Sequence, residues 1–385
     1  MTKRDIYLAN KKFRDAIKLL KESNITNRNK LLIEKFSEFC FAESLGVHRV
    51  VKYIYTLKNI AQELDKDFDK AKKDDIIKVV GKIEKSNYSS WTKKDYKVTI
   101  KKFYKWLRGG EEYPEEVKWI KTTIKRSERK LPEDLLTEED IQKLLQSAKN
   151  IRDKAFIATL YETGARIGEI ASVRIKDIIF DKHGAILIID GKTGMRRNRV
   201  ILADPYLRQY INQHPYKDNP EASLWLKQDN KPLTYTALSK IIKETAKKAG
   251  IKKKIHAHLF RHSRATYLAQ HLTEAQLCAY LGWKQGSEMP SVYIHLSGRD
   301  IDKAILGIYG IKIEDTQKRE PKLKPKRCPR CNALNTPEAK FCTQCGLALD
   351  ISTAMKLKQF KDLANEIMTH PKYAHIKRAF LEWFR

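Results

Sequence analysis

The stretch Thr163–Ile170, TGARIGEI, places Gly164 where one helical pattern ends and another begins. Arg166 stands two residues after this glycine, and Glu169 follows three residues later. The flanking sequence is apolar, so the turn and its guanidinium are expected to lie inside the protein. Because a buried arginine needs an anion, Arg166 is predicted either to pair with Glu169 in a structural salt bridge or to bind an anionic ligand.

The amino-acid composition is strongly basic. The chain of 385 residues has 77 Lys and Arg against 47 Asp and Glu, which gives a formal net charge of +30. This balance predicts a polyanionic partner, and nucleic acid is favoured over an acidic membrane surface. A saline or hot habitat is the alternative explanation, but there lysine and glutamate rise together, whereas here lysine exceeds the acids.

No part of the sequence has the pattern of a membrane or secretion segment. No apolar run is long enough to cross a bilayer, and the first twenty residues carry charges throughout. We therefore expect a cytoplasmic protein with no membrane partner, whose six cysteines are thiols or metal ligands. Cys40 and Cys278 stand alone in apolar surroundings and are interpreted as core residues.

The chain is too long for one ordinary core, so several domains are expected. Apolar residues at three-four spacing predict helices in the first and middle parts, and "GAILIID" with "RNRVILAD" predicts a β-hairpin. Thr137 opens the middle part with a capping-box-like pattern. We divide the chain into a helical N-terminal domain (1–110), a linker (111–136), a middle domain (137–313), a basic linker (314–327), a cysteine cluster (328–346) and an amphipathic helical tail (347–385).

Five further side chains of the middle domain offer one chemistry together with Arg166, although each alone is a weak signal. Two arginines can grip the non-bridging oxygens of a phosphodiester and stabilise the charge of its transition state. A lysine on a loop can protonate the leaving oxygen, and a tyrosine hydroxyl can act as the nucleophile. This attack needs no metal. The five residues are Lys192, His258, Arg261, Trp283 and Tyr293.

These motifs resemble those of a tyrosine recombinase of the phage-integrase type, archaeal or Xer-like. The matching segments are "TGARIGEI", "GKTGMRRNRVIL", "HLFRHSRAT", "LGW" and "VYIHLS", in that order, within about residues 30–312. The resemblance implies a mainly α fold with a small β-sheet (α+β), made of a helical core-binding domain and a tyrosine-recombinase catalytic domain. It also implies a site-specific DNA recombinase, or integrase, that acts on double-stranded DNA as a homo-oligomer (tetramer).

The resemblance also implies a role for each residue. Arg166 and Arg261 clamp the scissile phosphate, with Glu169 orienting the arginine turn. Lys192 is the general acid toward the 5′ oxygen, and His258 assists proton transfer. Tyr293 is the nucleophile that forms a 3′-phosphotyrosyl link. Most family members have histidine where Trp283 stands; the indole N–H can donate a hydrogen bond to the phosphate but cannot carry a proton.

Other residues compete for these roles. Lys192 could be an ordinary solvated lysine of a basic turn. Arg196 or Arg264 could be the phosphate ligand in place of Arg261, which is preferred because it completes the His-x-x-Arg spacing on one helix face. Tyr267 and Tyr280 lie within helical patterns, unlike Tyr293. His262 and His295 are interpreted as packing or supporting residues, and "SGRDIDKAILGIYG" resembles the helix that docks into a neighbouring protomer, with docking in cis as the alternative.

Two Cys-x-x-Cys pairs separated by ten residues predict a metal site. Four thiolates in this arrangement suit a tetrahedral structural zinc, since four protein ligands leave no open position. "CPRCNALNTPEAKFCTQCG" resembles small zinc ribbons, which lie outside the recombinase resemblance. The predicted ligands are Cys328, Cys331, Cys342 and Cys345.

Two other functions remain open on the sequence alone. A type IB topoisomerase-like enzyme shares the phosphotyrosyl chemistry but works as a monomer. A DNA-binding accessory protein that has lost catalysis would share the basic surface, although candidates for all the main catalytic roles argue against it.

Overall fold

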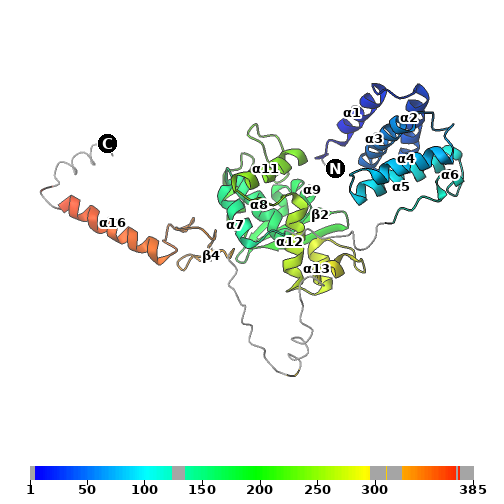
Figure 1. Cartoon of the computed structure of the whole chain (residues 1–385). Coiled ribbons are helices and arrows are strands. Elements are labelled where there is room, and N and C mark those ends of the chain that lie inside the picture. Colours follow the sequence, from blue (N-terminus) through cyan, green and yellow to red (C-terminus); the bar gives the residue numbers. More distant parts are fainter. Residues whose placement is uncertain (1–4, 124–134, 295–308, 310–322, 370–371, 373–385) are drawn as a thin grey trace. The chain divides into compact units, whose positions relative to one another are not determined.

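The structure is a computed structural model that describes residues 5–123, 135–294, 309, 323–369 and 372. The chain divides into two compact units, Met1–Glu133 and Asp134–Arg385 (Figure 1). Both are mainly helical, and the second contains small antiparallel sheets, so the predicted α+β class is confirmed. None of the described helices is long and apolar enough to cross a membrane.

The N-terminal unit is a helical bundle around an aromatic core. The apolar spacing that predicts its third helix places Val50, Ile54 and Leu57 in this core, each almost fully buried. Buried Asn29 accepts a hydrogen bond from the Phe68 N–H and holds the loop beyond that helix. The helices are α1 (Ala9–Lys21), α2 (Asn27–Ala42), α3 (Val47–Leu64), α4 (Lys73–Lys85), α5 (Ser90–Arg108) and α6 (Glu115–Lys118).

The N-terminal unit extends beyond the boundary that the sequence suggests. Helix α5 ends at Gly109, whose φ of 70° is the left-handed conformation that favours glycine. The chain then forms α6 within the stretch 111–136, which the sequence analysis assigns to a linker. Val117 and Ile120 are almost fully buried in the core of the unit. The first part of the supposed linker is therefore folded, because these two apolar residues fill the core; residues 124–134 lie outside the described part.

Ile120→Ala should show that this segment carries part of the unit's stability. Removing a buried side chain of this size should lower the free energy of unfolding by roughly 3 kcal/mol. The neighbouring exposed variant Lys121→Ala should leave it nearly unchanged. Urea unfolding followed by circular dichroism measures the free energy of unfolding of both variants. Equal effects of the two changes would mean that the segment is a linker and no part of the folded core.

The second unit contains the helices that the middle-domain patterns predict. Thr137 and Asp140 form the predicted capping box, with bonds of 3.2 and 3.1 Å between side chain and backbone. Helix α8 is buried along most of its length, and α7, α10 and α12 all contact it. The helices are α7 (Glu138–Ser147), α8 (Ile151–Thr163), α9 (Ile167–Ala171), α10 (Asp204–Asn212), α11 (Tyr235–Lys248), α12 (Ala257–Ala269), α13 (Glu274–Leu281) and α14 (Met289–Ile294).

The predicted hairpin is part of a three-stranded antiparallel sheet. Strands β2 (Gly184–Gly191) and β3 (Gly194–Val200) pair through a two-residue turn, and β1 (Ile178–Asp181) adds a strand beside β2 that the sequence analysis missed. Buried Glu162 of α8 accepts the backbone N–H groups of residues 201–203 at 2.7, 3.1 and 2.8 Å. This carboxylate holds the residues that follow β3 against α8.

The C-terminal part contains a small two-stranded ribbon and a helix. Strands β4 (Lys326–Arg327) and β5 (Leu334–Asn335) pair, and α16 (Ile351–Thr369) follows. Phe360 and Leu363, two of the apolar residues at helical spacing, are exposed on α16. The aromatic residues near the chain end lie outside the described residues.

Candidate active site

The turn that carries Arg166 depends on a glycine. Helix α8 ends at Gly164, whose φ is 55°. A Cβ there would come within 2.9 Å of a Leu281 methyl group, so side-chain space and backbone conformation both require glycine. Arg166 is the N-cap of α9, and its Nη1 donates to Glu169 Oε1 at 2.8 Å. The side chain of Arg166 is still 36% exposed, so the pair leaves the guanidinium accessible.

Glu169 serves two arginines at once. Its Oε2 lies 2.6 Å from Nη2 of Arg196, and both side chains are only 7% exposed. Burial alone would raise the pKa of Glu169, but the hydrogen bond and charge of Arg196, together with Arg166, bring it below its usual range. Cβ atoms at Gly191 and Gly282 would come within 2.7 and 2.8 Å of Arg196 Nη1, so both glycines make room for this side chain.

Arg261 joins three elements of the unit. It is buried on α12, and its Nη1 donates to the Gly164 carbonyl at 3.0 Å while Nη2 donates to the Leu281 carbonyl at 2.7 Å. Burial and the charge of Arg166 lower the pKa of Arg261 to about 10. Burial, and after it the charge of Arg261, lowers the pKa of His258. Three arginines thus face one carboxylate, which leaves the site with excess positive charge for an anion.

Tyr293 on α14 contacts two other rings. Trp283 stacks on it with ring centroids 5.1 Å apart and planes 17° apart, and the His262 ring centroid lies 5.9 Å from it with planes 27° apart. The Tyr293 hydroxyl is 2.6 Å from His262 Nδ1. The guanidinium carbon of Arg261 lies 5.3 Å from the Trp283 ring centroid. The structure therefore brings Arg261, Trp283 and Tyr293 together, and adds His262, which the sequence analysis gave only a supporting role.

The competing tyrosines and arginine have other partners. The Tyr280 hydroxyl lies 3.1 Å from the carbonyl oxygens of Glu162 and Arg199. Arg264 donates to the Glu162 carbonyl and lies over the ring of Tyr267. These contacts tie α12 and α13 to the central helix, and His295 lies outside the described residues.

Lys192 lies in a loop that contacts the site through its neighbour Thr193. It is exposed in the turn between β2 and β3, and among the described residues no hydrogen bond or ion pair joins it to a partner. The next residue, Thr193, donates to the Gly282 carbonyl at 3.3 Å and so holds the tip of the hairpin beside the turn that leads to Trp283. The exposed lysine is thereby held near the site through its neighbour in the turn.

The four cysteines of the ribbon form a compact set. All four Sγ atoms lie within 4.8 Å of one another, with Cys328–Cys345 at 3.6 Å and Cys331–Cys342 at 3.5 Å. A zinc tetrahedron with bonds of about 2.3 Å has sulfur–sulfur edges of about 3.8 Å, so the set fits zinc. Burial alone would raise the pKa of Cys342, but nearby backbone N–H groups lower it to about 6, which favours the thiolate.

Two segments of the chain match known protein families. Residues 134–299 match the phage integrase family, and residues 327–349 match a zinc-ribbon domain. Tyrosine recombinase XerD of Oceanobacillus iheyensis is 28% identical over 284 residues, which cover 69% of this chain and 93% of that protein. Tyrosine recombinase XerA of Pyrococcus horikoshii is 25% identical over 281 residues, or 72% and 93% of the two chains.

Residues 134–299 thus form a domain of the phage integrase family, and the similar proteins are tyrosine recombinases. Solved structures show the same fold. XerH site-specific recombinase bound to palindromic difH substrate has a TM-score of 0.56 at 19% identity, covering 79% of this chain and 97% of that one. A lambda integrase tetramer bound to a Holliday junction has a TM-score of 0.57 at 14% identity, covering 70% and 78%.

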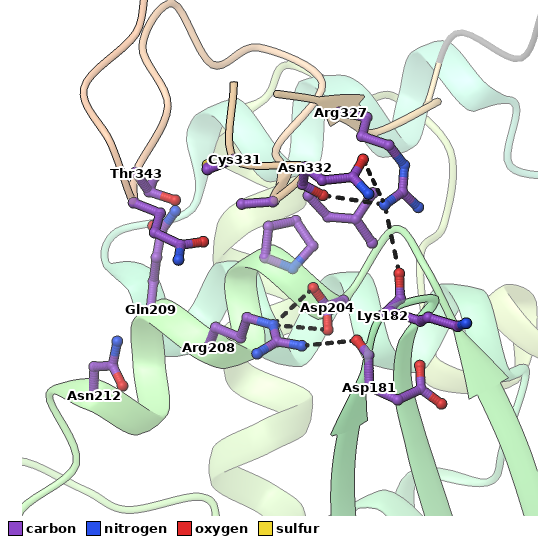
Figure 2. A pocket seen from close by; sticks show the side chains of 14 residues that line it. Asp181, Lys182, Asp204, Arg208, Gln209, Asn212, Arg327, Cys331, Asn332 and Thr343 are labelled. Atoms are coloured by element: carbon purple, nitrogen blue, oxygen red, sulfur yellow. Dashed lines mark hydrogen bonds and ion pairs between the residues drawn. The ribbon is translucent and has the colours of Figure 1, made fainter. Parts of the chain in front are cut away.

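The zinc ribbon packs on the unit that contains the phage integrase domain. The Tyr206 hydroxyl of α10 donates to the Glu338 carboxylate, 2.9 Å from each oxygen, and Arg327 donates to the Lys182 carbonyl at 3.4 Å. Figure 2 shows the pocket of about 560 Å³ between them, where Arg208 pairs with Asp204 of the same helix and donates to the Asp181 carbonyl at the end of β1. The ribbon thus contacts α10 and the end of β1, whereas the residues around Tyr293 come from α12, α14 and the turn after α13.

Arg196→Met should test whether the shared carboxylate supports the fold of the recombinase. The change leaves buried Glu169 with one arginine, and breaking a buried pair should lower the free energy of unfolding by roughly 3 kcal/mol. Arg199→Met is the matched control. Arg199 is also on β3, but its pair with Asp181 of β1 is about one third exposed, so its loss should lower the free energy of unfolding less. If urea unfolding gave equal losses of unfolding free energy for the two variants, burial of the Arg196–Glu169 pair would not add to stability.

Cys342→Ser should abolish zinc binding by the ribbon. One of four thiolate ligands is lost, whereas Cys278→Ser changes a buried cysteine outside the set and should leave the zinc content unchanged. Elemental analysis of purified protein should give one zinc per chain for the native protein and for the Cys278 variant. A full complement of zinc in the Cys342 variant would contradict the four-cysteine site.

Proposed function

We propose that this chain is a site-specific DNA recombinase that cuts and rejoins double-stranded DNA through a 3′-phosphotyrosyl link to Tyr293. The observation that carries the proposal is the position of Tyr293. Its ring stacks on Trp283, and Trp283 lies under Arg261 in a site with more arginine than carboxylate charge. A tyrosine held beside buried cations is placed to attack a bound phosphodiester.

The residues divide the reaction among them. Arg166 and Arg261 would hold the non-bridging oxygens and stabilise the charge that develops on them. The oxygen of Tyr293 forms a bond to phosphorus as the bond to the 5′ oxygen breaks. Lys192 gives that oxygen a proton. Its side chain is exposed on the hairpin tip and is therefore free to move toward the leaving group. The indole N–H of Trp283 can donate to the phosphate, and His258 assists the transfer of protons.

Rejoining is the reverse of cleavage. A 5′ hydroxyl attacks the phosphotyrosyl bond, and Tyr293 leaves with its oxygen reprotonated. When that hydroxyl belongs to another DNA strand, the product is recombinant. The phosphotyrosyl link conserves the bond energy, so neither a nucleotide nor a metal ion is needed for the chemistry, and zinc serves only the ribbon.

Double-stranded DNA and further copies of the chain are the proposed partners. A net charge of +30 favours association with a polyanion. Among proteins of the same fold, XerH is bound to difH substrate, and lambda integrase is found as a dimer on a core site and a tetramer on a Holliday junction. A tetramer of this chain on DNA fits the same chemistry. Action in the cytoplasm also fits, since thiolates of the ribbon need a reducing compartment.

Tyr293→Phe should abolish covalent capture of DNA. The change removes one oxygen while the ring stack remains, so folding and DNA affinity should persist. In a duplex nicked close to the cleavage point, the short fragment that carries the 5′ hydroxyl dissociates after cleavage and rejoining is prevented. The trapped covalent intermediate is then seen on a denaturing gel. Tyr267→Phe is the matched control and should still form the covalent band. A band with the Tyr293 variant would exclude Tyr293 as the nucleophile.

A supercoiled plasmid carrying two cognate sites separates the three possible activities. Recombinant circles are expected for a site-specific recombinase. Relaxation without exchange would indicate a type IB topoisomerase-like enzyme, and neither product together with tight DNA binding would indicate an accessory protein. The Tyr293→Phe protein serves as the negative control for both reactions.

A further inference from the structure

We propose that His262 accepts the proton of Tyr293 when the tyrosine attacks DNA. The inference rests on the proposed function and adds a catalytic residue to it. Its basis is the hydrogen bond of 2.6 Å between His262 Nδ1 and the Tyr293 hydroxyl, within a site where that hydroxyl is almost fully buried. His262 therefore touches the atom that forms the new bond to phosphorus.

The nucleophile needs a base because it is a phenol in a buried position. Burial raises the pKa of Tyr293, with Arg261 opposing the shift, so few molecules hold the phenolate at neutral pH. A hydroxyl that attacks phosphorus must lose its proton as the bond forms. Within the described residues, the hydrogen bond to His262 is the one that the Tyr293 hydroxyl makes. His258, the residue expected to assist proton transfer, lies one helical turn away, with its ring centroid 6.3 Å from that of His262.

His262 is in the right protonation state to accept. Burial comes first, and His258, His256 and Arg261 then lower its pKa to about 4. The imidazole is therefore neutral near pH 7, and a proton on Nε2 leaves Nδ1 free to accept from the phenol. Among the described residues, the titratable groups that act on it are His258 and Arg261 of its own helix, the N-cap residue His256, and Tyr293 of α14.

The neighbouring rings hold the phenol in place for this transfer. Trp283 lies against the Tyr293 ring at 17°, and the His262 ring lies at 27° to it, so both restrict rotation of the phenol. A bound phosphate brings negative charge beside Arg261 and stabilises the imidazolium that forms. The proton moves from oxygen to Nδ1 as the phosphotyrosyl bond forms, and Lys192 separately protonates the 5′ oxygen. In rejoining, the imidazolium returns its proton to the tyrosine oxygen, so protons balance over the cycle.

The test compares two scissile bonds in single-turnover cleavage of a duplex oligonucleotide. One substrate has the natural 5′ oxygen and the other has sulfur at that bridging position, whose thiolate leaves without an acid. His262→Phe and His262→Asn should slow cleavage of both substrates by roughly 100-fold, because the nucleophile still has to lose its proton. Lys192→Ala is the matched control: it should be slow with oxygen and restored by sulfur.

The Asn variant separates a base from a positioning residue. Its side-chain oxygen can accept the tyrosine hydrogen bond where Nδ1 does, but it cannot hold the proton. Near-native cleavage by His262→Asn would show that the contact only positions the phenol and would overturn the proposal. Rescue of the His262 variants by sulfur would overturn it too, since it would place the histidine at the leaving group. If the Phe variant does not fold, the Asn variant alone decides.

The pH dependence gives a second readout. With His262 present, cleavage should stay level from about pH 6 to about pH 9, because the base is neutral throughout. Without it, the rate should rise with pH as the phenol ionises unaided. A level profile for the His262→Asn protein would contradict the proposal. Absence of a covalent band with the native protein would instead refute the recombinase function itself, so the two failures are distinguishable.

Discussion

The shared carboxylate of Glu169 is the interaction on which the rest of the site depends. One acidic side chain, largely removed from water, neutralises part of the charge of Arg166 at the turn after α8 and of Arg196 on β3. Without it, two cations would lie close together in a region of low dielectric constant, at a cost of several kcal/mol. With it, the hairpin and the arginine turn are held as one piece. Thr193 then fixes the hairpin tip to the residue before Trp283.

Arg261 extends this framework to the nucleophile. Its two Nη atoms bind the carbonyls that end α8 and α13, so the same side chain fixes the arginine turn and the start of the loop that carries Trp283. Its face also lies over the tryptophan ring on which Tyr293 stacks. Burying the Arg261 cation in the free protein costs free energy, but the side chain need not reorganise when a phosphate binds. The site is thus built for an anion before the anion is bound.

The sequence revealed those features whose signals are local. The glycine turn before Arg166, the capping box at Thr137 and the hairpin each need only a few neighbouring residues to be recognised, and all three appear in the structure. The third strand, β1, was missed because four residues offer little periodicity. The sequence assigns the segment around α6 to a linker because its two core residues, Val117 in the helix and Ile120 after it, stand in a charged, proline-containing stretch, and burial of so few side chains leaves no pattern.

Contacts made by residues far apart in the sequence could not be predicted in this way. His262 stands beside Arg261 in a familiar motif, yet only folding brings its ring to Tyr293, thirty-one positions later. The same holds for Tyr206 and Glu338, which join the catalytic unit to the ribbon.

The tryptophan at position 283, where most family members have histidine, has a physical explanation. The expected histidine could carry a proton, but it offers a smaller ring for Tyr293 to stack on and a weaker face for Arg261. If His262 supplies the base, the residue at position 283 is released from proton transfer and can be selected for packing and for one hydrogen bond to phosphate. The departure from the family pattern and the histidine beside Arg261 then have a single physical explanation: acid–base work and stacking are divided between two side chains that flank the same phenol.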